Sequence, residues 1–472
     1  MNLNTHPSLD QPTVAVVGGG AAGTLTAIRL LRQASCPMRI ALVEARPEPA
    51  RGLAYGTRHD EHLLNVPAGK MSGFAETPDD FLDYALAHGN PDALPRDALA
   101  KAFLPRRLYG DYLRTRLDQA RAASTSQLDV LRDTAVAIDR SPDGWRLALA
   151  SGMTLPADAV VLAVGNTPRP LPARGGAGLP AGRVVAAWDH DAVHGIGTDE
   201  AVAIVGSGLS MADSVLSLES NGHRGPVHVL SRHAMPPLAH ASFPRLADVD
   251  VDALAALPLR GRVAFLRGRV RDAAAQGLPW QAVMEALRPH GPRLWRTLSA
   301  ADQRRFLRHA VRHWDVHRHR VAAPVAAMLQ RLRAEGRLSL HRTRLQRVAA
   351  LADGRLRLEG RAADGRLLQL DVDRVVNATG VEMRVQFMGN PLLDDLLGRG
   401  LAVPGPHAIG LDSLADGDDD GALVAADGRA QPDLRVLGSL RIGTLWESLA
   451  IPELRVQAAT VAARLLARIG AG

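Results

Sequence analysis

The chain has 472 residues, of which 46% are hydrophobic and 22% are charged, and its formal net charge is +7. Its length predicts two or three domains with a large buried core, and no apolar run reaches the roughly 20 residues that span a bilayer. The single cysteine, Cys36, excludes an internal disulfide and a Cys-x-x-Cys pair, and therefore a flavin disulfide reductase that uses its own dithiol.

The positive charge comes almost entirely from arginine, since Lys70 and Lys101 are the two lysines of the chain. This composition is typical of a GC-rich genome, and the sequence shows no zinc finger or other nucleic-acid-binding module. We therefore expect no nucleic-acid partner. The N-terminus lacks the basic and apolar regions of a signal peptide, which predicts a cytoplasmic protein with no membrane partner. The sequence leaves the oligomeric state open.

The first predicted unit is a strand, a glycine-rich turn and a helix. Four apolar residues, Val14–Val17, lead into a Gly-x-Gly-x-x-Gly turn that a helical pattern follows. In such a turn the first glycine permits the tight bend, the second lets the backbone approach a pyrophosphate, and the third allows close packing of helix on strand. The helix N-terminus offers free N–H groups to the phosphates. The turn residues expected at the cofactor are Gly18, Gly20, Ala21, Ala22 and Gly23.

A second strand over residues 39–43 ends in Glu44 and Ala45. An acid about 20 residues after the glycines is placed to bind the ribose hydroxyls of a dinucleotide. An irregular segment follows over residues 51–74, then two helices, and then alternating strands over residues 127–164 that end in Gly165. We expect this glycine at the same cofactor.

The same order of elements occurs a second time. A strand leads into the turn Gly206-Ser-Gly208-Leu-Ser210-Met211, and its second strand ends in Ser231 and Arg232. Later strands lead to an apolar run that ends in Gly380, as the first set ends in Gly165. This repetition predicts an α/β protein with two Rossmann-like dinucleotide-binding domains.

The two turns differ in the residues that select the cofactor. The first has a third glycine and the acid Glu44, whereas the second has Met211 in place of the third glycine and Arg232 in place of the acid. An acid repels a 2′-phosphate, and an arginine binds one through charge-assisted hydrogen bonds. We therefore assign FAD to the first turn and NADPH to the second. A solvated surface arginine is the alternative for Arg232.

These elements predict one domain inserted in another. Residues 1–170 are expected to form the first part of the FAD domain, residues 180–375 the NADPH domain with a helical insertion at about 236–336, and residues 376–472 the second part of the FAD domain.

Two nucleotide turns in this order resemble those of the two-dinucleotide-binding-domain flavoproteins, and within them the NADPH-dependent flavin monooxygenases, including the N-hydroxylating ones. The chain also resembles a bacterial family of FAD/NAD(P)-binding proteins. The stretches that carry the second resemblance are Gly52-Leu-Ala-Tyr-Gly56, His62-Leu-Leu-Asn65-Val-Pro-Ala-Gly-Lys-Met71, Leu104-Pro-Arg-Arg-Leu-Tyr-Gly-Asp-Tyr112 and Gly443-Thr-Leu-Trp446-Glu447.

The resemblance implies an FAD-dependent, NADPH-using oxidoreductase. A monooxygenase of this class uses molecular oxygen to form a flavin hydroperoxide, which hydroxylates a soft nucleophile such as an amine. The helical insertion would supply the pocket for a small substrate, and its arginines favour an anionic or carboxylate-bearing one. Two alternatives stay open: a flavin reductase or dehydrogenase without oxygen activation, and a non-catalytic cofactor-binding sensor or partner protein.

The resemblance also implies which residues lie near the flavin. We expect Asn65, Met71 and Trp446 beside the ring and Gly438 at the FAD, with core packing or turn capping as the alternative roles. No side chain is predicted as an acid or base. Two departures bear on hydroxylation: the Phe-x-Gly-x-x-x-His pattern before the second turn is missing, and Gly438-Ser439 stands where Gly-Asp is common.

The insertion also contains His313, His317 and His319. Two of these histidines share a helical face at i, i+4, but arginines interleave them and no cysteine or glutamate joins them. We therefore predict no metal site.

Overall fold

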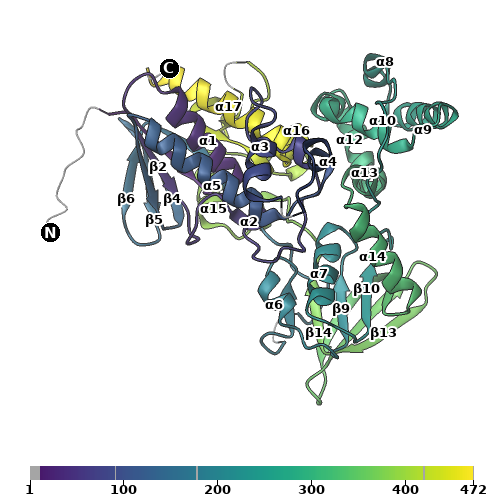
Figure 1. Ribbon diagram of the computed structural model, residues 1–472. Helices are drawn as coiled ribbons and strands as arrows, with labels where there is room; N and C mark the ends of the chain where they lie inside the picture. Colours follow the sequence, from purple (N-terminus) through teal and green to yellow (C-terminus); the bar gives the residue numbers. More distant parts are fainter. Residues whose placement is uncertain (1–10, 91, 177–178, 418–419, 471–472) are drawn as a thin grey trace. The chain divides into compact units, whose positions relative to one another are not determined.

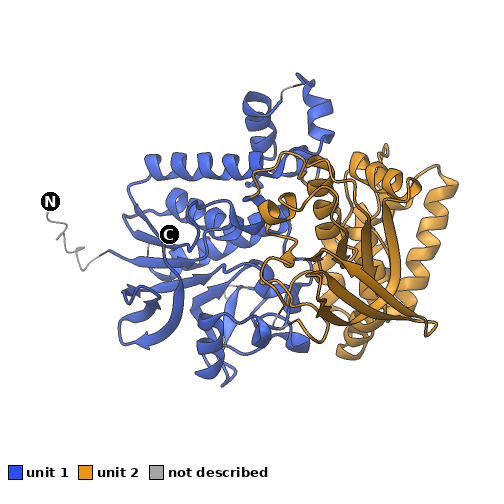
Figure 2. Ribbon diagram, turned by 90° about the horizontal axis from the view of Figure 1, so that it is seen from below, with its two compact units in different colours: residues 1–56, 67–166, 383–472 blue, residues 57–66, 167–382 orange. Residues whose placement is uncertain are grey.

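The structure is a computed structural model that describes residues 11–90, 92–176, 179–417 and 420–470. The chain divides into two compact units. Unit 1 comprises Met1–Gly56, Pro67–Asn166 and Met383–Gly472, and unit 2 comprises Thr57–Val66 and Thr167–Glu382 (Figure 2). Of the helices in the described ranges, none combines the length and apolar character required to cross a bilayer.

The centre of unit 1 is a six-stranded sheet in the order β15-β16-β7-β1-β2-β3. Five strands are parallel, and β15 runs antiparallel to β16. The inner strands are buried apolar runs, as expected of a parallel sheet covered on both faces. The strands are β1 Thr13–Val17, β2 Arg39–Val43, β3 Gln127–Leu131, β7 Ala159–Leu162, β15 Ala422–Val424 and β16 Ala430–Val436.

Three long helices of unit 1 lie side by side, with α1 packed against both α5 and α17 (Figure 1). Their bounds are α1 Ala21–Gln33, α5 Arg106–Ala123 and α17 Ile451–Arg468. The shorter helices of the unit are α2 Gly52–Tyr55, α3 Asp80–His88, α4 Arg96–Lys101, α15 Pro391–Gly398 and α16 Ile442–Leu445.

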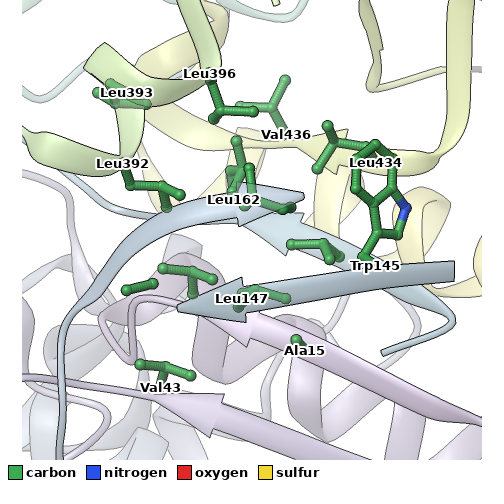
Figure 3. Close-up of a cluster of buried hydrophobic side chains, with 14 of the residues drawn as sticks. Ala15, Val43, Trp145, Leu147, Leu162, Leu392, Leu393, Leu396, Leu434 and Val436 are labelled. Atoms are coloured by element: carbon green, nitrogen blue, oxygen red, sulfur yellow. The ribbon is translucent and has the colours of Figure 1, made fainter. Parts of the chain in front are cut away.

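An antiparallel sheet of three strands adds a second layer to unit 1. It consists of β4 Ala135–Ser141, β5 Gly144–Leu149 and β6 Thr154–Ala157. Trp145 and Leu147 of β5 are buried in one hydrophobic cluster with Leu162 of the parallel sheet and Leu393 of α15 (Figure 3). This cluster holds the strands whose carboxyl ends carry the predicted cofactor residues.

Trp145 is the largest side chain in that cluster and is only 1% exposed, and its Nε1 has no hydrogen-bond partner among the described residues. We expect Trp145→Ala to lower the free energy of unfolding by about 3–5 kcal/mol, because it leaves a large cavity. Trp145→Phe removes no hydrogen bond and keeps an aromatic ring in the cluster, so it should lower the free energy of unfolding by less than about 1.5 kcal/mol. Urea denaturation followed by circular dichroism measures both, and equal losses would contradict the packing role.

Unit 2 has a seven-stranded sheet in the order β13-β12-β11-β10-β9-β14-β8. The first half of β11 pairs in parallel with β10, and its second half pairs antiparallel with β12. The strands are β8 Val184–Ala186, β9 Val202–Val205, β10 Val227–Ser231, β11 Leu338–Ala350, β12 Leu356–Ala362, β13 Leu367–Val372 and β14 Arg374–Asn377. The associated helices are α6 His190–His194, α7 Leu209–Ser220 and α14 Ala323–Ala334.

Six further α-helices lie between β10 and α14 in the chain (Figure 1). The first four of them, with their connecting loops, share a small apolar core. The six helices are α8 Val251–Ala256, α9 Leu259–Ala275, α10 Trp280–Leu287, α11 Gly291–Arg296, α12 Ala300–Arg305 and α13 Val311–Arg318. This is the part of the chain in which the sequence predicts a helical insertion.

The chain passes between the units at points that differ from the predicted boundaries. Thr57–Val66 belongs to unit 2 although the residues on either side of it belong to unit 1. The final return to unit 1 lies after Glu382 rather than at 375/376, because β14 pairs with β9 and β8 in the sheet of unit 2. Gly380 therefore lies in unit 2 and not in the second part of the FAD domain.

Candidate functional site

The first glycine turn connects β1 to α1 in unit 1. Gly18 has φ +103°, and a Cβ at this position would lie 2.3 Å from the carbonyl oxygen of Ala163. A Cβ on Gly23 would lie 1.9 Å from the carbonyl oxygen of Gly18. Both positions therefore require glycine. Gly18 needs it for its left-handed backbone and its close approach to Ala163, and Gly23 needs it so that α1 can pack against the turn.

The N-terminus of α1 is open to an anion. Its N-cap residue is Gly20, and no side chain caps the helix. The unpaired N–H groups of the first turn are the donors that bind phosphate in dinucleotide folds. A Cβ on Gly52 would lie 3.1 Å from the Cα of Gly20, so the backbone at the start of α2 approaches the turn closely. These features fit a bound pyrophosphate.

Glu44 follows β2 and lies beside this turn. Its Oε2 accepts a hydrogen bond from the backbone N–H of Gly19 at 2.7 Å, and its Oε1 accepts one from Arg46 N–H at 2.8 Å. Each carboxylate oxygen has a second lone pair. The side chain is therefore fixed in place and can still accept hydrogen bonds from ribose hydroxyls. Ala45 continues the chain from the same edge of the sheet.

Two further predicted residues follow neighbouring strands at this edge. The Ser439 hydroxyl donates to the carbonyl oxygen of Gly165, which follows β7, at 2.6 Å. Gly438, which follows β16, has φ +77°, and a Cβ there would lie 3.7 Å from the Cβ of Ala22. Because the carboxyl ends of parallel strands meet at one edge, the structure gathers Gly165 and Gly438 with the first turn.

The predicted neighbours of the flavin ring are not gathered in one unit. Met71 lies in unit 1 and is only 2% exposed. Trp446 follows α16 in unit 1 with φ +63°, a conformation that is rare for a large side chain. Asn65 lies in unit 2 with an exposed side chain, and its carbonyl accepts a hydrogen bond from His240 Nε2 at 3.0 Å.

The second glycine turn repeats the first in unit 2. Gly206 has φ +116°, and a Cβ there would lie 2.1 Å from the carbonyl oxygen of Ala378. Gly208 is the N-cap of α7, which again has no side-chain cap. Met211, in the position of Gly23, is 1% exposed, so a buried side chain fills the space that the first turn leaves for close packing. Gly380 follows β14 with φ +87°, as Gly165 follows β7 with φ +79°.

Hydroxyl groups line the second turn. The Ser210 hydroxyl accepts a hydrogen bond from Trp188 Nε1 at 3.2 Å. The hydroxyls of Ser207 and Ser231 are 2.9 Å apart, which ties the turn to the end of β10. The following residue, Arg232, is exposed at that strand end.

Arg312 of α13 is a residue of this site that sequence reasoning missed. Its guanidinium donates to the carbonyl oxygen of Ser207 at 2.9 Å and to that of Met235. Burial lowers the pKa of Arg312, and the charge of Arg232 lowers it further. Burial also lowers the pKa of His233, as do the charges of Arg232 and Arg312. Arg232, His233 and Arg312 thus form a basic cluster whose positive charges repel one another. An anion bound among them would relieve that repulsion, and a 2′-phosphate is such an anion.

Other arginines of the insertion serve its own packing. Arg262 donates from Nε to the carbonyl oxygen of Leu257 at 2.8 Å and from its terminal nitrogens to other carbonyls. Arg320 is buried and forms an ion pair with Glu285. Arg262 and Arg320 are therefore engaged within the insertion, and the anionic or carboxylate-bearing substrate stays a prediction.

The histidines that the sequence marks in the insertion lie on α13 and at its C-terminal end. His317 Nδ1 donates to the carbonyl oxygen of His313 at 2.7 Å, within one helix. Within the described ranges the side chains of His59, Glu61 and His194 form a group that could hold a metal ion. The sequence prediction of no metal site did not consider these three residues.

Residues 15–167 match a family model described as FAD-NAD(P)-binding. No curated protein sequence matches the chain. Among solved structures, the ornithine N-hydroxylase of Kutzneria sp. 744, determined with reduced FAD, NADP+ and L-ornithine, has a TM-score of 0.65 at 18% identity and covers 97% of this chain and 100% of its own.

Two other solved structures share the fold. The L-lysine 6-monooxygenase of Pseudomonas syringae has a TM-score of 0.64 at 17% identity, covering 97% of this chain and 99% of its own. The FAD-bound cadaverine monooxygenase of Erwinia amylovora has a TM-score of 0.61 at 12% identity, covering 96% and 94%. These findings confirm the predicted fold: the chain has the two-dinucleotide-binding-domain flavoprotein fold of these monooxygenases. The match of residues 15–167 to an FAD-NAD(P)-binding family model agrees with the predicted cofactor class.

Proposed function

We propose that the protein is an FAD-dependent, NADPH-using monooxygenase that hydroxylates the nitrogen of a small primary amine. The observation that carries this proposal is the pair of unequal turns. Gly18–Gly23 with Glu44 suits FAD, and Gly206–Met211 with Arg232 and Arg312 suits a nucleotide with a 2′-phosphate. The shared fold with enzymes named for ornithine, lysine and cadaverine supports the amine substrate.

The residues of the chain have defined tasks in this proposal. The N–H groups at the start of α1 bind the FAD pyrophosphate, and Glu44 orients its ribose. The start of α7 receives the NADPH pyrophosphate, and the basic cluster binds the 2′-phosphate. When bound, the flavin supplies the redox chemistry with NADPH and molecular oxygen, while the protein positions the reactants and excludes water.

The test is a reaction of the purified, flavin-loaded protein with NADPH, oxygen and a panel of L-ornithine, L-lysine and cadaverine. We expect NADPH to reduce the flavin and a hydroxylamine product to form with an equivalent amount of NADPH consumed. Reduction that yields only hydrogen peroxide with every amine would contradict hydroxylation and favour a reductase. A protein that binds FAD but is not reduced by NADPH or NADH would contradict the enzyme itself and favour a cofactor-binding sensor.

A further inference from the structure

Two histidines and a glutamate meet on the surface of unit 2, away from both glycine turns in the sequence. His59 and Glu61 lie on Thr57–Val66, and His194 is the last residue of α6. One potential ligand atom of each residue lies within 4.8 Å of those of the other two. The imidazole rings of His59 and His194 are 4.6 Å apart between centroids. Residues that are 135 positions apart in the chain therefore present a two-histidine, one-carboxylate set.

A buried histidine fixes the segment that carries two of these residues. His62 is fully buried, its Nδ1 lies 2.8 Å from the Thr57 hydroxyl, and its Nε2 lies 2.9 Å from the Ser217 hydroxyl of α7. Its ring also lies 4.3 Å from that of His190 at the start of α6. These contacts hold the segment against α6 and α7, so His59 and Glu61 are positioned before any ion binds.

The partners of the three residues match those of a metal site. His59 Nε2 lies 3.0 Å from Asp191 Oδ1, and His59 Nδ1 lies 3.6 Å from Glu61 Oε1. In the neutral tautomer that donates from Nε2 to Asp191, the Nδ1 lone pair is available to a metal ion. A carboxylate that accepts from the far nitrogen of a ligating histidine is the usual second partner of a zinc ligand. The Ser220 hydroxyl donates to Glu61 Oε1 at 2.6 Å and lies 3.4 Å from His194 Nδ1.

We propose that His59, Glu61 and His194 bind a divalent first-row transition-metal ion of the Zn²⁺ class. Two imidazole nitrogens and one carboxylate oxygen suit this class, whereas Mg²⁺ and Ca²⁺ prefer oxygen ligands alone. Ligand bonds of about 2.0–2.2 Å put the ligand atoms of a tetrahedral ion about 3.3–3.6 Å apart, so a small closure of the cluster suffices. His59 and Glu61 are 15% and 24% exposed, which lets an ion enter and water fill the fourth position.

The ion would fasten Thr57–Val66 to α6. This segment leaves unit 1 after Gly56 and returns to it at Pro67, and in unit 2 it makes the contacts of His62 described above. Three ligands from two separate elements close a long loop of chain, and binding energy at such a site adds to the stability of the folded unit. Metal binding at this site is independent of the proposed amine hydroxylation.

The experiment uses tag-free, full-length, FAD-loaded protein that has been freed of metal by a chelator and dialysis. Titration calorimetry with Zn²⁺ should show one ion per chain, and Zn²⁺ should raise the melting temperature. His59→Ala and His194→Ala should each weaken Zn²⁺ binding at least about 100-fold, and Asp191→Asn should weaken it about 10–100-fold through His59. Titration with Mg²⁺ should show no binding at this site.

His313→Ala is the matched control, because His313 is an exposed histidine of the same unit. It should leave Zn²⁺ affinity unchanged. Glu61→Gln, which keeps the shape of the side chain, guards against misfolding, and retained FAD absorbance and circular dichroism identify the folded variants. The proposal is overturned if the wild type binds no Zn²⁺, or if folded His194→Ala and Glu61→Gln proteins bind it as tightly as the wild type.

Discussion

Gly18→Ala is expected to abolish FAD binding, while Gly206→Ala leaves FAD bound and abolishes NADPH binding. In each variant the new Cβ would lie 2.3 Å or less from a backbone carbonyl oxygen, at a residue whose φ exceeds +100°. Both carbonyl groups belong to the backbone and cannot swing aside, so the turn itself must move. We expect this to weaken binding of the nucleotide by more than about 3 kcal/mol, which is at least about 100-fold in affinity. Flavin absorbance of the purified variants and NADPH titration measure the two effects.

Gly152→Ala and Gly222→Ala are the matched controls, one for each unit. Their glycines have φ +88° and +80°, but nothing lies within 4 Å of the added Cβ. These two substitutions introduce backbone strain but no steric clash. Each should lower the free energy of unfolding by about 1 kcal/mol and leave the binding of both nucleotides unchanged. If Gly18→Ala retained FAD as these controls do, the first turn could not be the phosphate-binding turn.

Arg232→Ala is expected to raise the KM for NADPH about 10–100-fold and to change the KM for NADH by less than about twofold. The arginine is exposed at the end of β10, next to Arg312, and makes no hydrogen bond or ion pair with the described residues. A guanidinium free of partners can form two charge-assisted hydrogen bonds with a 2′-phosphate, and NADH has no such group. Steady-state flavin reduction with each nucleotide measures the difference.

Arg366→Ala controls for the loss of one positive charge from unit 2. Arg366 is 83% exposed and forms an ion pair with Asp364 two residues away in the β12–β13 turn. Its replacement should affect neither nucleotide. If Arg232→Ala raised both KM values equally, its role would be structural and the NADPH assignment would lose its main residue.

Local pattern was sufficient to predict the two strand–turn–helix units. Val14–Val17 is an uninterrupted apolar run, Gly18 and Gly206 both have the left-handed backbone that their place in the motif requires, and Glu44 reaches the first turn. These features depend on residues close together in the chain. Steric and periodic rules act over that range, so the sequence exposes them directly.

The alternative roles of single side chains could not be separated in this way. The sequence predicts Met71 beside the flavin, with a structural loop as the alternative, and the side chain is buried in unit 1. Asn65, six residues earlier, falls in unit 2. The sequence between them carries no periodic pattern that marks where the chain crosses from one unit to the other. Their contact with the flavin stays a prediction.

What the sequence by itself determined is the pair of glycine turns, the residues in which they differ and the α/β fold with two dinucleotide-binding domains. Only the tertiary structure decided that Arg312 of the insertion joins Ser207, that β14 and Gly380 belong to unit 2, and that His59, Glu61 and His194 meet. The physical reason is the range of the interactions. Glycine geometry and strand periodicity act between near neighbours in the chain. The contact of Arg312 with Ser207, the pairing of β14 and the proposed metal ligands instead join residues that are 100 or more positions apart, and only the packed fold fixes the distance between them.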